Sequence, residues 1–486
     1  MGEDYYLVNS SFEYFPGIPI WKSRDLVNWQ QIGHVLTRDS QLPLESIGSS
    51  KGVFAPTIRY HDGTFYVVSS VVEGGEMFYV TASDPAGPWS EPVWLNESEW
   101  GMDPSLLFDD DGKVYYTRHG GQEQGGIYQA ELDLQGGRLV GTAREIWGGT
   151  GGVWPEGPHL YKIDGTYYLM ISEGGTSYDH KITIARSSSP WGPFESFSEN
   201  PILTHSDRTS EPIQATGHGD LVQTPEGNWW MILLGIRPTD GSHHHLGRET
   251  FLAPVTWNGD GWPVVNGDEP IAVTMPGAGL PNAAPVPPES LRDDFGGAEL
   301  GLYWNYLRNP TPTNYSLATR AGFLRLTGTS TTMDDQASPT FVARRQRHLS
   351  CRVSTVLEYE PPADGHEAGL VLRQNEANHY DLVVTYIGGA PHARLRSRVA
   401  GTATTVGEAD LADGPVTLIV EATPMSYQFF VASGGAEPVS LGTLDTAPLS
   451  SESAGGFTGV YFGLYARTPS GTAAPADFDS FEIEPR

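Results

Sequence analysis

Two acidic residues, one histidine and one aromatic residue occupy equivalent positions in the first half of the chain. Phe54, Asp103, Glu156 and His218 each lie eight residues before a turn of the Asp-Gly or Glu-Gly type. Carboxyl and imidazole groups are the side chains that most often transfer protons in catalysis. Because they recur at one position of a repeated unit, they indicate a site rather than scattered surface charge.

The turns belong to a repeat that continues into an aromatic-rich strand. Asp-Gly is favoured in two-residue hairpin turns because both positions tolerate positive φ. Five copies occur, at residues 2–8, 62–68, 111–116, 164–170 and 226–232. Units of roughly 50 to 60 residues with this content predict a five-bladed β-propeller, in which the innermost strand of each blade precedes the turn. The four residues at the start of those strands would then face the central channel.

Composition limits the kinds of partner. A chain of 486 residues with 58 glycines and 37 prolines indicates more than one domain and many short strands. Its net charge of −30 repels phosphate backbones and anionic lipid, so neither nucleic acid nor a membrane is expected as a partner. The single cysteine, Cys351, cannot form an intramolecular disulfide and favours a reducing compartment, hence the cytoplasm over secretion.

Strings of residues around the candidate positions resemble glycoside hydrolase family 43, particularly its β-xylosidase and α-L-arabinofuranosidase members with a C-terminal sandwich. They follow the family's order at residues 11–17, 23–29, 55–58, 102–105 (Met-Asp-Pro-Ser), 156–161 (Glu-Gly-Pro-His-Leu-Tyr), 173–176, 217–219 (Gly-His-Gly) and 247–250 (Gly-Arg-Glu-Thr). Any one string is weak evidence, but together they are specific. The fructan-cleaving family with the same domain plan is disfavoured, because its Asn-Asp-Pro-Asn and Arg-Asp-Pro motifs are absent.

The resemblance implies an inverting exo-glycosidase. It would release terminal β-D-xylosyl or α-L-arabinofuranosyl residues from xylo-oligosaccharides or arabinoxylan. Inverting glycosidases place a general acid at the glycosidic oxygen and a general base behind the anomeric carbon, with a water molecule between. By the resemblance Glu156 is the general acid, and Asp103 is a third carboxylate that raises the pKa of the acid and orients it.

The resemblance also implies residues that bind the sugar. His218 and Arg248 match residues of the −1 subsite, where a guanidinium can bind vicinal hydroxyls in fixed geometry. Phe12 and Phe54 are expected in a hydrophobic pocket wall, and packing between blades would explain them equally well. No cofactor is required, although a corresponding histidine in some relatives helps to hold calcium, which leaves a structural calcium ion open. Residues 243–245 are three consecutive histidines, which cannot all face one metal ion from a loop.

The general base is expected outside the given sequence. In the family it is an aspartate just before the strand that here opens at residues 2–6. The repeat register agrees, because eight residues before the first turn falls upstream of Met1. We therefore expect the first blade to be incomplete. This leaves an alternative open, namely a catalytically impaired fragment or a non-catalytic carbohydrate-binding protein.

A second domain is expected after the propeller, giving an all-β chain. Residues 275–288 are rich in Pro, Ala and Gly and are predicted to link a propeller at 1–274 to a domain at 289–486. Alternating strands there predict a jelly-roll, concanavalin-like β-sandwich. In relatives of this layout the sandwich lends an aromatic to the pocket rim; Phe457 is the candidate, with plain core packing as the competing interpretation. Such relatives are often oligomers, so a homo-oligomer is compatible with the sequence.

Overall fold

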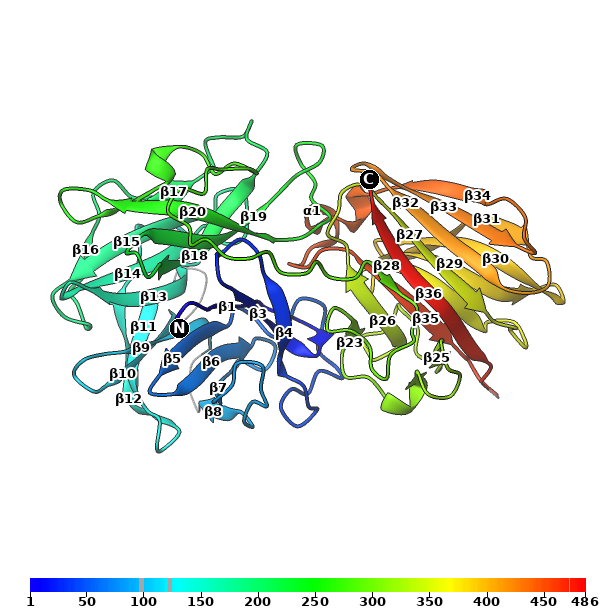
Figure 1. Ribbon diagram of the computed structural model, residues 1–486, viewed down its shortest axis with the longest axis horizontal. Helices are drawn as coiled ribbons and strands as arrows, with labels where there is room; N and C mark the ends of the chain where they lie inside the picture. The colour runs from blue at the N-terminus through cyan, green and yellow to red at the C-terminus, as the bar shows by residue number, and fades with distance from the viewer. Residues whose placement is uncertain (96–99, 121–124, 472) are drawn as a thin grey trace.

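The computed structural model describes residues 1–95, 100–120, 125–471 and 473–486. Figure 1 shows two bodies side by side, a propeller from the N-terminal half and a sandwich from the C-terminal half. The predicted all-β class is confirmed: in the described residues the exceptions are the short helices α1 (Ser451–Ala454), η1 (Asn266–Asp268), η2 (Pro312–Asn314) and η3 (Ala447–Leu449). Within those residues, no helix has the length and apolar character needed to cross a membrane.

Five sheets form the blades, as the repeat predicted. In each of the last four, the inner strand leads through the recurring turn into the aromatic-rich strand. In sheet order the blades are β1 (Tyr5–Val8), β3 (Gly17–Ser23) and β4 (Gln30–Leu36); β5 (Thr57–His61), β6 (Thr64–Val71), β7 (Glu76–Ala82) and β8 (Val93–Leu95); β9 (Gly101–Phe108), β10 (Val114–Gly120), β11 (Ile127–Asp133) and β12 (Arg138–Trp147); β13 (Glu156–Ile163), β14 (Thr166–Glu173), β15 (Lys181–Ser187) and β16 (Glu195–Ser196), with β17 (Leu203–Thr204) on β15; and β18 (Gln214–Gln223), β19 (Trp229–Ile236), β20 (Glu249–Trp257) and β21 (Pro263–Val265).

The aromatic residues of the repeat pack between neighbouring blades. Phe65 of the second blade belongs to the same buried cluster as Val8 of the first, and Tyr115 of the third blade to the same buried cluster as Leu169 of the fourth. Burying a side chain of this size stabilises the fold by roughly 1.5–3 kcal/mol. The recurring turn and aromatic strand therefore supply both the hairpin of each blade and its contact with the next.

The first blade has three strands in the described residues, and β1 follows the first recurring turn. A groove of about 920 Å³ runs beside β1. Leu7 of β1, Ile58 of β5 and Leu221 of β18 line this groove, which places it between the first, second and fifth blades. The N-terminus lies near the middle of the propeller in Figure 1.

Irregular backbone marks the inner strands at the candidate positions. The pairing register shifts beside Asp103 in β9, at Glu156 in β13 and around His218 in β18. Asp103 and His218 also have positive φ values of 53° and 50°. A β-bulge re-aims side chains out of the regular alternation. The same device therefore acts in three blades, at the residues that the repeat register selected.

The second body is a concanavalin-like sandwich, as predicted. One sheet has the order β2 (Tyr14–Phe15), β23 (Asn305–Leu307), β26 (Thr340–Arg345), β35 (Tyr461–Arg467), β28 (Glu367–Asn375), β29 (Asn378–Ile387), β30 (Ala390–Val399) and β31 (Thr402–Asp410). The other has the order β24 (Tyr315–Ser316), β25 (Leu324–Thr327), β36 (Pro475–Pro485), β27 (Cys351–Glu358), β32 (Val416–Ala422), β33 (Ser426–Ser433) and β34 (Val439–Asp445), with β22 (Arg292–Asp293) on β36. Residues 275–288, all of them described, contain neither helix nor strand.

The sandwich takes one strand from the propeller half of the chain. β2 lies between β1 and β3 in sequence, yet it pairs with β23 through Tyr14 and Leu307. Tyr14 is 1 % exposed and stacks on Tyr461 of β35, with 3.9 Å between the ring centroids. The connection between two strands of the first blade is thus an edge of the sandwich sheet.

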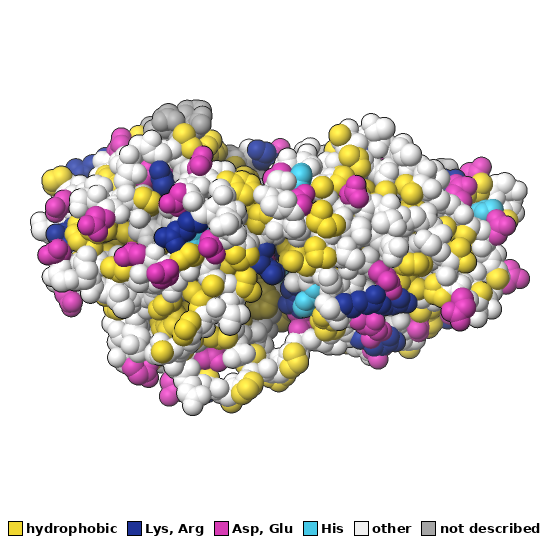
Figure 2. Space-filling view, turned by 90° about the horizontal axis from the view of Figure 1, so that it is seen from above, with side chains coloured by type: hydrophobic (Ala, Val, Ile, Leu, Met, Phe, Trp, Pro, Cys, Tyr) yellow, Lys and Arg dark blue, Asp and Glu magenta, His cyan; other side chains and the backbone are white. Residues whose placement is uncertain are grey.

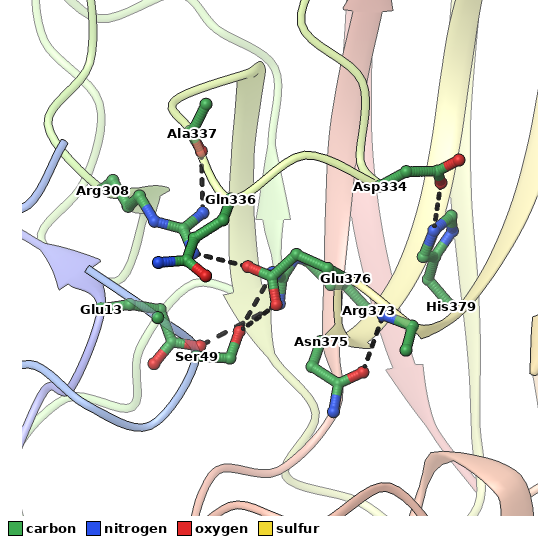
Figure 3. A network of polar contacts seen from close by, with 12 residues as sticks. Glu13, Ser49, Arg308, Asp334, Gln336, Ala337, Arg373, Asn375, Glu376 and His379 are labelled. Atoms are coloured by element: carbon green, nitrogen blue, oxygen red, sulfur yellow. Dashed lines mark hydrogen bonds and ion pairs between the residues drawn. The ribbon is translucent and has the colours of Figure 1, made fainter. Parts of the chain in front are cut away.

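A buried polar network holds the two bodies together beside β2 (Figure 3). Glu13, Arg308 and Arg373 have side chains with no exposed area. The backbone N–H of Arg308 donates to the carbonyl oxygen of Glu13 over 2.8 Å. Glu376 accepts from Arg373 over 2.8 Å and from Ser49 of the propeller over 2.9 Å. The network therefore joins the two bodies through buried groups, and removing one partner of a buried pair is costly because it leaves an uncompensated charge.

Candidate active site

Three aromatic side chains from both bodies form one cluster, which we call the aromatic wall. Phe12 follows β1, Phe54 precedes β5, and Phe457 precedes β35 of the sandwich. The ring centroids lie 5.5 Å apart for Phe12 and Phe54, 5.9 Å for Phe12 and Phe457, and 5.8 Å for Phe54 and Phe457. The structure thus brings together the three aromatic residues that the sequence analysis selected.

Backbone contacts fix the aromatic wall in place. Phe12 and Val53 exchange two backbone hydrogen bonds of 3.0 Å, which holds Phe12 beside Phe54. The backbone N–H of Phe457 donates to Oγ of Ser50 over 3.0 Å. The propeller therefore positions the aromatic residue that the sandwich supplies.

Arg248 lies against the aromatic wall. Its guanidinium carbon is 5.1 Å from the ring centroid of Phe12 and 5.3 Å from that of Phe457. Next to it, Gly247 lies so close to the sandwich that a Cβ atom there would stand 2.4 Å from the backbone nitrogen of Gly459. Burial lowers the pKa of Arg248 to about 10, so the group is still a cation at neutral pH. Figure 2 shows the surface hollowed where the two bodies meet, with basic side chains beside the hollow.

Glu156 and Asp103 are buried carboxyl groups near this cation. Glu156 opens β13 and is 8 % exposed; Asp103 lies in β9 and is 6 % exposed. Burial raises the pKa of Glu156 well above its ordinary value, and the negative charge of Asp103 raises it further, while Arg248 lowers it. Burial also raises the pKa of Asp103. Because two close carboxyl groups do not both ionise readily, this pair retains a proton to higher pH than an ordinary carboxyl.

His218 packs against the backbone next to Glu156. A Cβ atom on Gly157 would lie 2.9 Å from Nε2 of His218, so that glycine leaves room for the ring. The backbone N–H of His218 donates to Oγ of Ser172 over 2.6 Å. Burial, and then the charge of Arg248, lowers the pKa of His218 to about 4, which makes it a neutral polar group at pH 7.

Two further buried histidines lie beside the carboxyl pair and were missed by the sequence analysis. His119 of β10 pairs across the hairpin with Met102, and its Nδ1 lies 2.7 Å from the carbonyl oxygen of Pro155. His180 immediately precedes β15, and its Nε2 lies 3.6 Å from Oε1 of Glu156. Folding the hairpin about its turn would have placed His119 beside the Asp103 position. No sequence pattern marks His180, because it immediately precedes β15 of the same blade as Glu156 and lies outside the register counted from the turns.

A structural calcium ion near His218 stays a prediction. No group of three His, Cys, Asp or Glu side chains that could hold a metal gathers within the described residues. Calcium takes six to eight oxygen ligands, and the nearby guanidinium of Arg248 would repel it.

Of the three consecutive histidines, His243 pairs with Asp240 and His244 with Glu452 of the sandwich, each through Nδ1, so they face different partners.

Comparison with known proteins agrees with this geometry. Residues 1–263 match the model for glycosyl hydrolases family 43, and residues 292–484 match that for the β-xylosidase C-terminal concanavalin A-like domain. A non-reducing end α-L-arabinofuranosidase of Bacteroides ovatus is 44 % identical over 99 % of this chain and 91 % of that protein. A xylosidase/arabinosidase of Butyrivibrio fibrisolvens is 39 % identical over 99 % of this chain and 96 % of that protein.

Solved structures give the same result. A family 43 protein of a Bacteroides ovatus xyloglucan utilisation locus superposes with a TM-score of 0.95 at 43 % identity, covering 100 % of this chain and 96 % of its own. A xylan β-1,4-xylosidase of Bacillus halodurans superposes with a TM-score of 0.94 at 36 % identity, with the same coverage. The carboxyl pair on the inner strands, the aromatic wall shared by two bodies and these matches have one explanation: the chain belongs to glycoside hydrolase family 43.

Proposed function

We propose that this protein is an inverting exo-glycosidase that removes terminal β-D-xylosyl or α-L-arabinofuranosyl residues from xylan-derived oligosaccharides or arabinoxylan. The observation that carries the proposal is the buried pair of Glu156 and Asp103, whose environment raises the pKa of both carboxyl groups. The names of its relatives, which include arabinofuranosidase and xylosidase/arabinosidase, supply the two sugars. The substrate partner is accordingly a neutral oligosaccharide, which suits the acidic surface.

In this mechanism Glu156 donates its proton to the glycosidic oxygen while the bond to the anomeric carbon breaks. A general acid must hold its proton near the working pH. Burial, the nearby charge of Asp103 and the moderating charge of Arg248 together supply that condition. Asp103 acts through Glu156, because an ionised Asp103 disfavours a second negative charge.

The aromatic wall and Arg248 would bind the terminal sugar. Aromatic rings offer an apolar surface to the carbon–hydrogen face of a sugar ring, and the guanidinium of Arg248 carries donors for vicinal hydroxyl groups. Phe457 makes the sandwich part of this subsite. A wall closed by a second domain admits the end of a chain more readily than its middle, which is consistent with exo-action.

An inverting glycosidase also needs a general base that activates the attacking water. Among carboxylates that line the groove beside β1, Asp220 is a poor candidate for that role, since its two oxygens already accept from Arg59 over 3.0 Å and from Tyr161 over 2.6 Å. Arg59 and His159 lower the pKa of Asp220 to about 2 despite its burial, which makes it a weak base.

The test is release of nitrophenol from the β-D-xyloside and the α-L-arabinofuranoside. The chain is compared with Glu156→Gln, which keeps the shape of the side chain and removes its titratable proton. We expect turnover of at least one substrate by the unmodified chain, and a loss of about 10²–10⁴-fold in Glu156→Gln. Binding of xylose or arabinose without turnover of either glycoside would contradict the proposal. The same would follow if Glu156→Gln retained full activity.

A further inference from the structure

A buried histidine with one unused ring nitrogen faces the proposed general acid. His180 has no exposed area, and its Nδ1 lies 3.1 Å from the carbonyl oxygen of Ala215. A carbonyl oxygen can only accept, so Nδ1 carries the hydrogen and Nε2 of the neutral ring carries a lone pair. Among the described residues that buried Nε2 atom has no hydrogen-bond partner, and it lies 3.6 Å from Oε1 of Glu156.

The surrounding chain makes room for the ring and fixes it. A Cβ atom on Gly217 would stand 2.2 Å from Cε1 and 2.3 Å from Nε2 of His180, so only glycine at 217 permits this placement. Two hydrogen bonds hold the backbone of His180. Its N–H donates to the carbonyl oxygen of Ser177, and the hydroxyl of Thr204 donates to the carbonyl oxygen of His180 over 3.0 Å. The first glycine of the Gly-His-Gly string therefore leaves room for the ring of His180, and it is also the neighbour of His218 in the chain.

The ring is neutral at any pH at which the enzyme would work. Burial lowers the pKa of His180 to about 3, and the nearby groups His218 and Arg248 act in the same direction. The titratable or charged groups around Glu156 are His180, Asp103 and Arg248, with His218 packed against Gly157. Of these, His180 brings its Nε2 atom to 3.6 Å from the carboxyl group, and this acceptor has no hydrogen-bond partner among the described residues. An unpaired buried acceptor is costly, and a protonated carboxyl is the donor that would satisfy it.

We propose that His180 is a positioning residue for Glu156: its Nε2 accepts a hydrogen bond from the protonated carboxyl in the free enzyme. The separation of 3.6 Å is longer than a hydrogen bond and requires a shift of well under 1 Å to form one. The proton stays on the carboxyl oxygen throughout. When substrate binds, the glycosidic oxygen replaces the imidazole as acceptor, so the bond holds the acid in its protonated form until that point.

This inference rests on the proposed role of Glu156 as general acid, and it predicts a particular pH profile. A bond to the protonated form stabilises that form, so removing the acceptor lowers the pKa of Glu156 in the free enzyme. In His180→Phe we expect the basic limb of kcat/KM to move to lower pH by about one unit, the amount that one hydrogen bond represents. The basic limb of kcat should move less, because in the complex the acceptor belongs to the substrate.

His205→Phe is the matched control. His205 is equally buried, its Nδ1 lies 2.7 Å from the carbonyl oxygen of Ile213, and its Nε2 accepts from the backbone of Ile271 over 3.0 Å rather than facing a carboxyl. It should lose stability without moving either limb. An unmoved or raised basic limb in His180→Phe would overturn the inference, as would an equal shift in His205→Phe.

A second measurement needs neither turnover nor the His180→Phe variant. In protein carrying ¹⁵N-labelled histidine, the Nε2 resonance of His180 should change across the pH range in which Glu156 titrates and be independent of pH in Glu156→Gln. A resonance that is independent of pH in the unmodified protein would overturn the proposal. Because this readout reports the contact itself, it separates a failure of this inference from a failure of the proposed glycosidase activity.

Discussion

Buried charges in the sandwich and at the propeller axis contain the same residue types and behave in opposite ways. In the sandwich, Asp381 lies 2.6 Å from Nδ1 of His379 and 2.8 Å from Nη2 of Arg396. Although burial opposes it, the charge of His379 lowers the pKa of Asp381 to about 2, and the pKa of His379 is raised. At the axis, burial dominates: the pKa of Asp103 is raised, and that of His180 is lowered to about 3.

Burial is therefore not what distinguishes a chemical site from a structural one in this protein. The sandwich carboxylates accept hydrogen bonds from cationic side chains, so these carboxylates stay ionised. Among the described residues, the guanidinium of Arg248 and buried imidazoles of lowered pKa lie near the axial carboxyl groups, and burial outweighs the charge of Arg248, so the pair retains a proton to higher pH. Under the roles proposed for Glu156 and Asp103, fold stability and catalysis make opposite demands on the same kind of side chain.

The largest effect should come from breaking the sandwich pair. Asp381→Ala removes the anion that His379 and Arg396 share and leaves them only Asp334 and Glu367, which we expect to lower the free energy of unfolding by about 3 kcal/mol. Urea denaturation followed by fluorescence measures the change. Asp103→Asn is the counterpart at the axis, where burial is the largest influence and opposes the charge that the substitution removes, so stability should fall much less. Equal destabilisation by the two substitutions would remove the distinction between the regions.

Asp103→Asn should instead affect turnover. Without the like charge beside it, the pKa of Glu156 falls and the acid is less often protonated at neutral pH. We expect kcat to fall about 10²-fold on nitrophenyl glycosides, which corresponds to roughly 2.7 kcal/mol of barrier. The basic limb of the pH profile should move to lower pH in the same assay. An unchanged basic limb would mean that Asp103 does not act through Glu156.

The raised pKa of Glu156 also predicts how stability depends on pH. In the unfolded chain this carboxyl releases its proton near its ordinary value of 4.5, while the folded protein retains it to higher pH. Folding stability should therefore fall as pH rises through that window, by up to about 1.4 kcal/mol per pH unit. Glu156→Gln lacks this dependence. As pH rises, its melting temperature should therefore increase relative to that of the unmodified protein. Parallel curves for the two proteins would contradict the raised pKa.

The smallest expected effect concerns the aromatic wall. Phe457→Ala removes the ring that the sandwich supplies, and we expect KM to rise about fivefold with less change in kcat. Phe323→Ala is the control, because that sandwich ring contacts Arg320 rather than the aromatic wall. If both variants bind substrate as the unmodified protein does, Phe457 packs the interface without touching sugar.

The repeat made the axial carboxyl groups predictable, while the contacts between blades and bodies were not. Counting eight residues back from each recurring turn identifies Asp103 and Glu156, because the blades share one register. His180 lies outside that register, and its contact depends on a glycine from the next blade. Phe457 was selected by resemblance alone. The pairing of β2 with β23 involves two residues, too few to carry an alternating pattern.

The strand β2 has a consequence for anyone who wishes to shuffle or fuse parts of this enzyme. Cutting at the irregular segment 275–288 looks like a clean division of the polypeptide. It would remove an edge strand from the sandwich and the Phe457 ring from the aromatic wall in a single operation. The propeller and the sandwich should therefore be transplanted as one cassette, and a hybrid carrying a foreign sandwich would need a new partner for Tyr14 as well as a new residue at the place of Phe457.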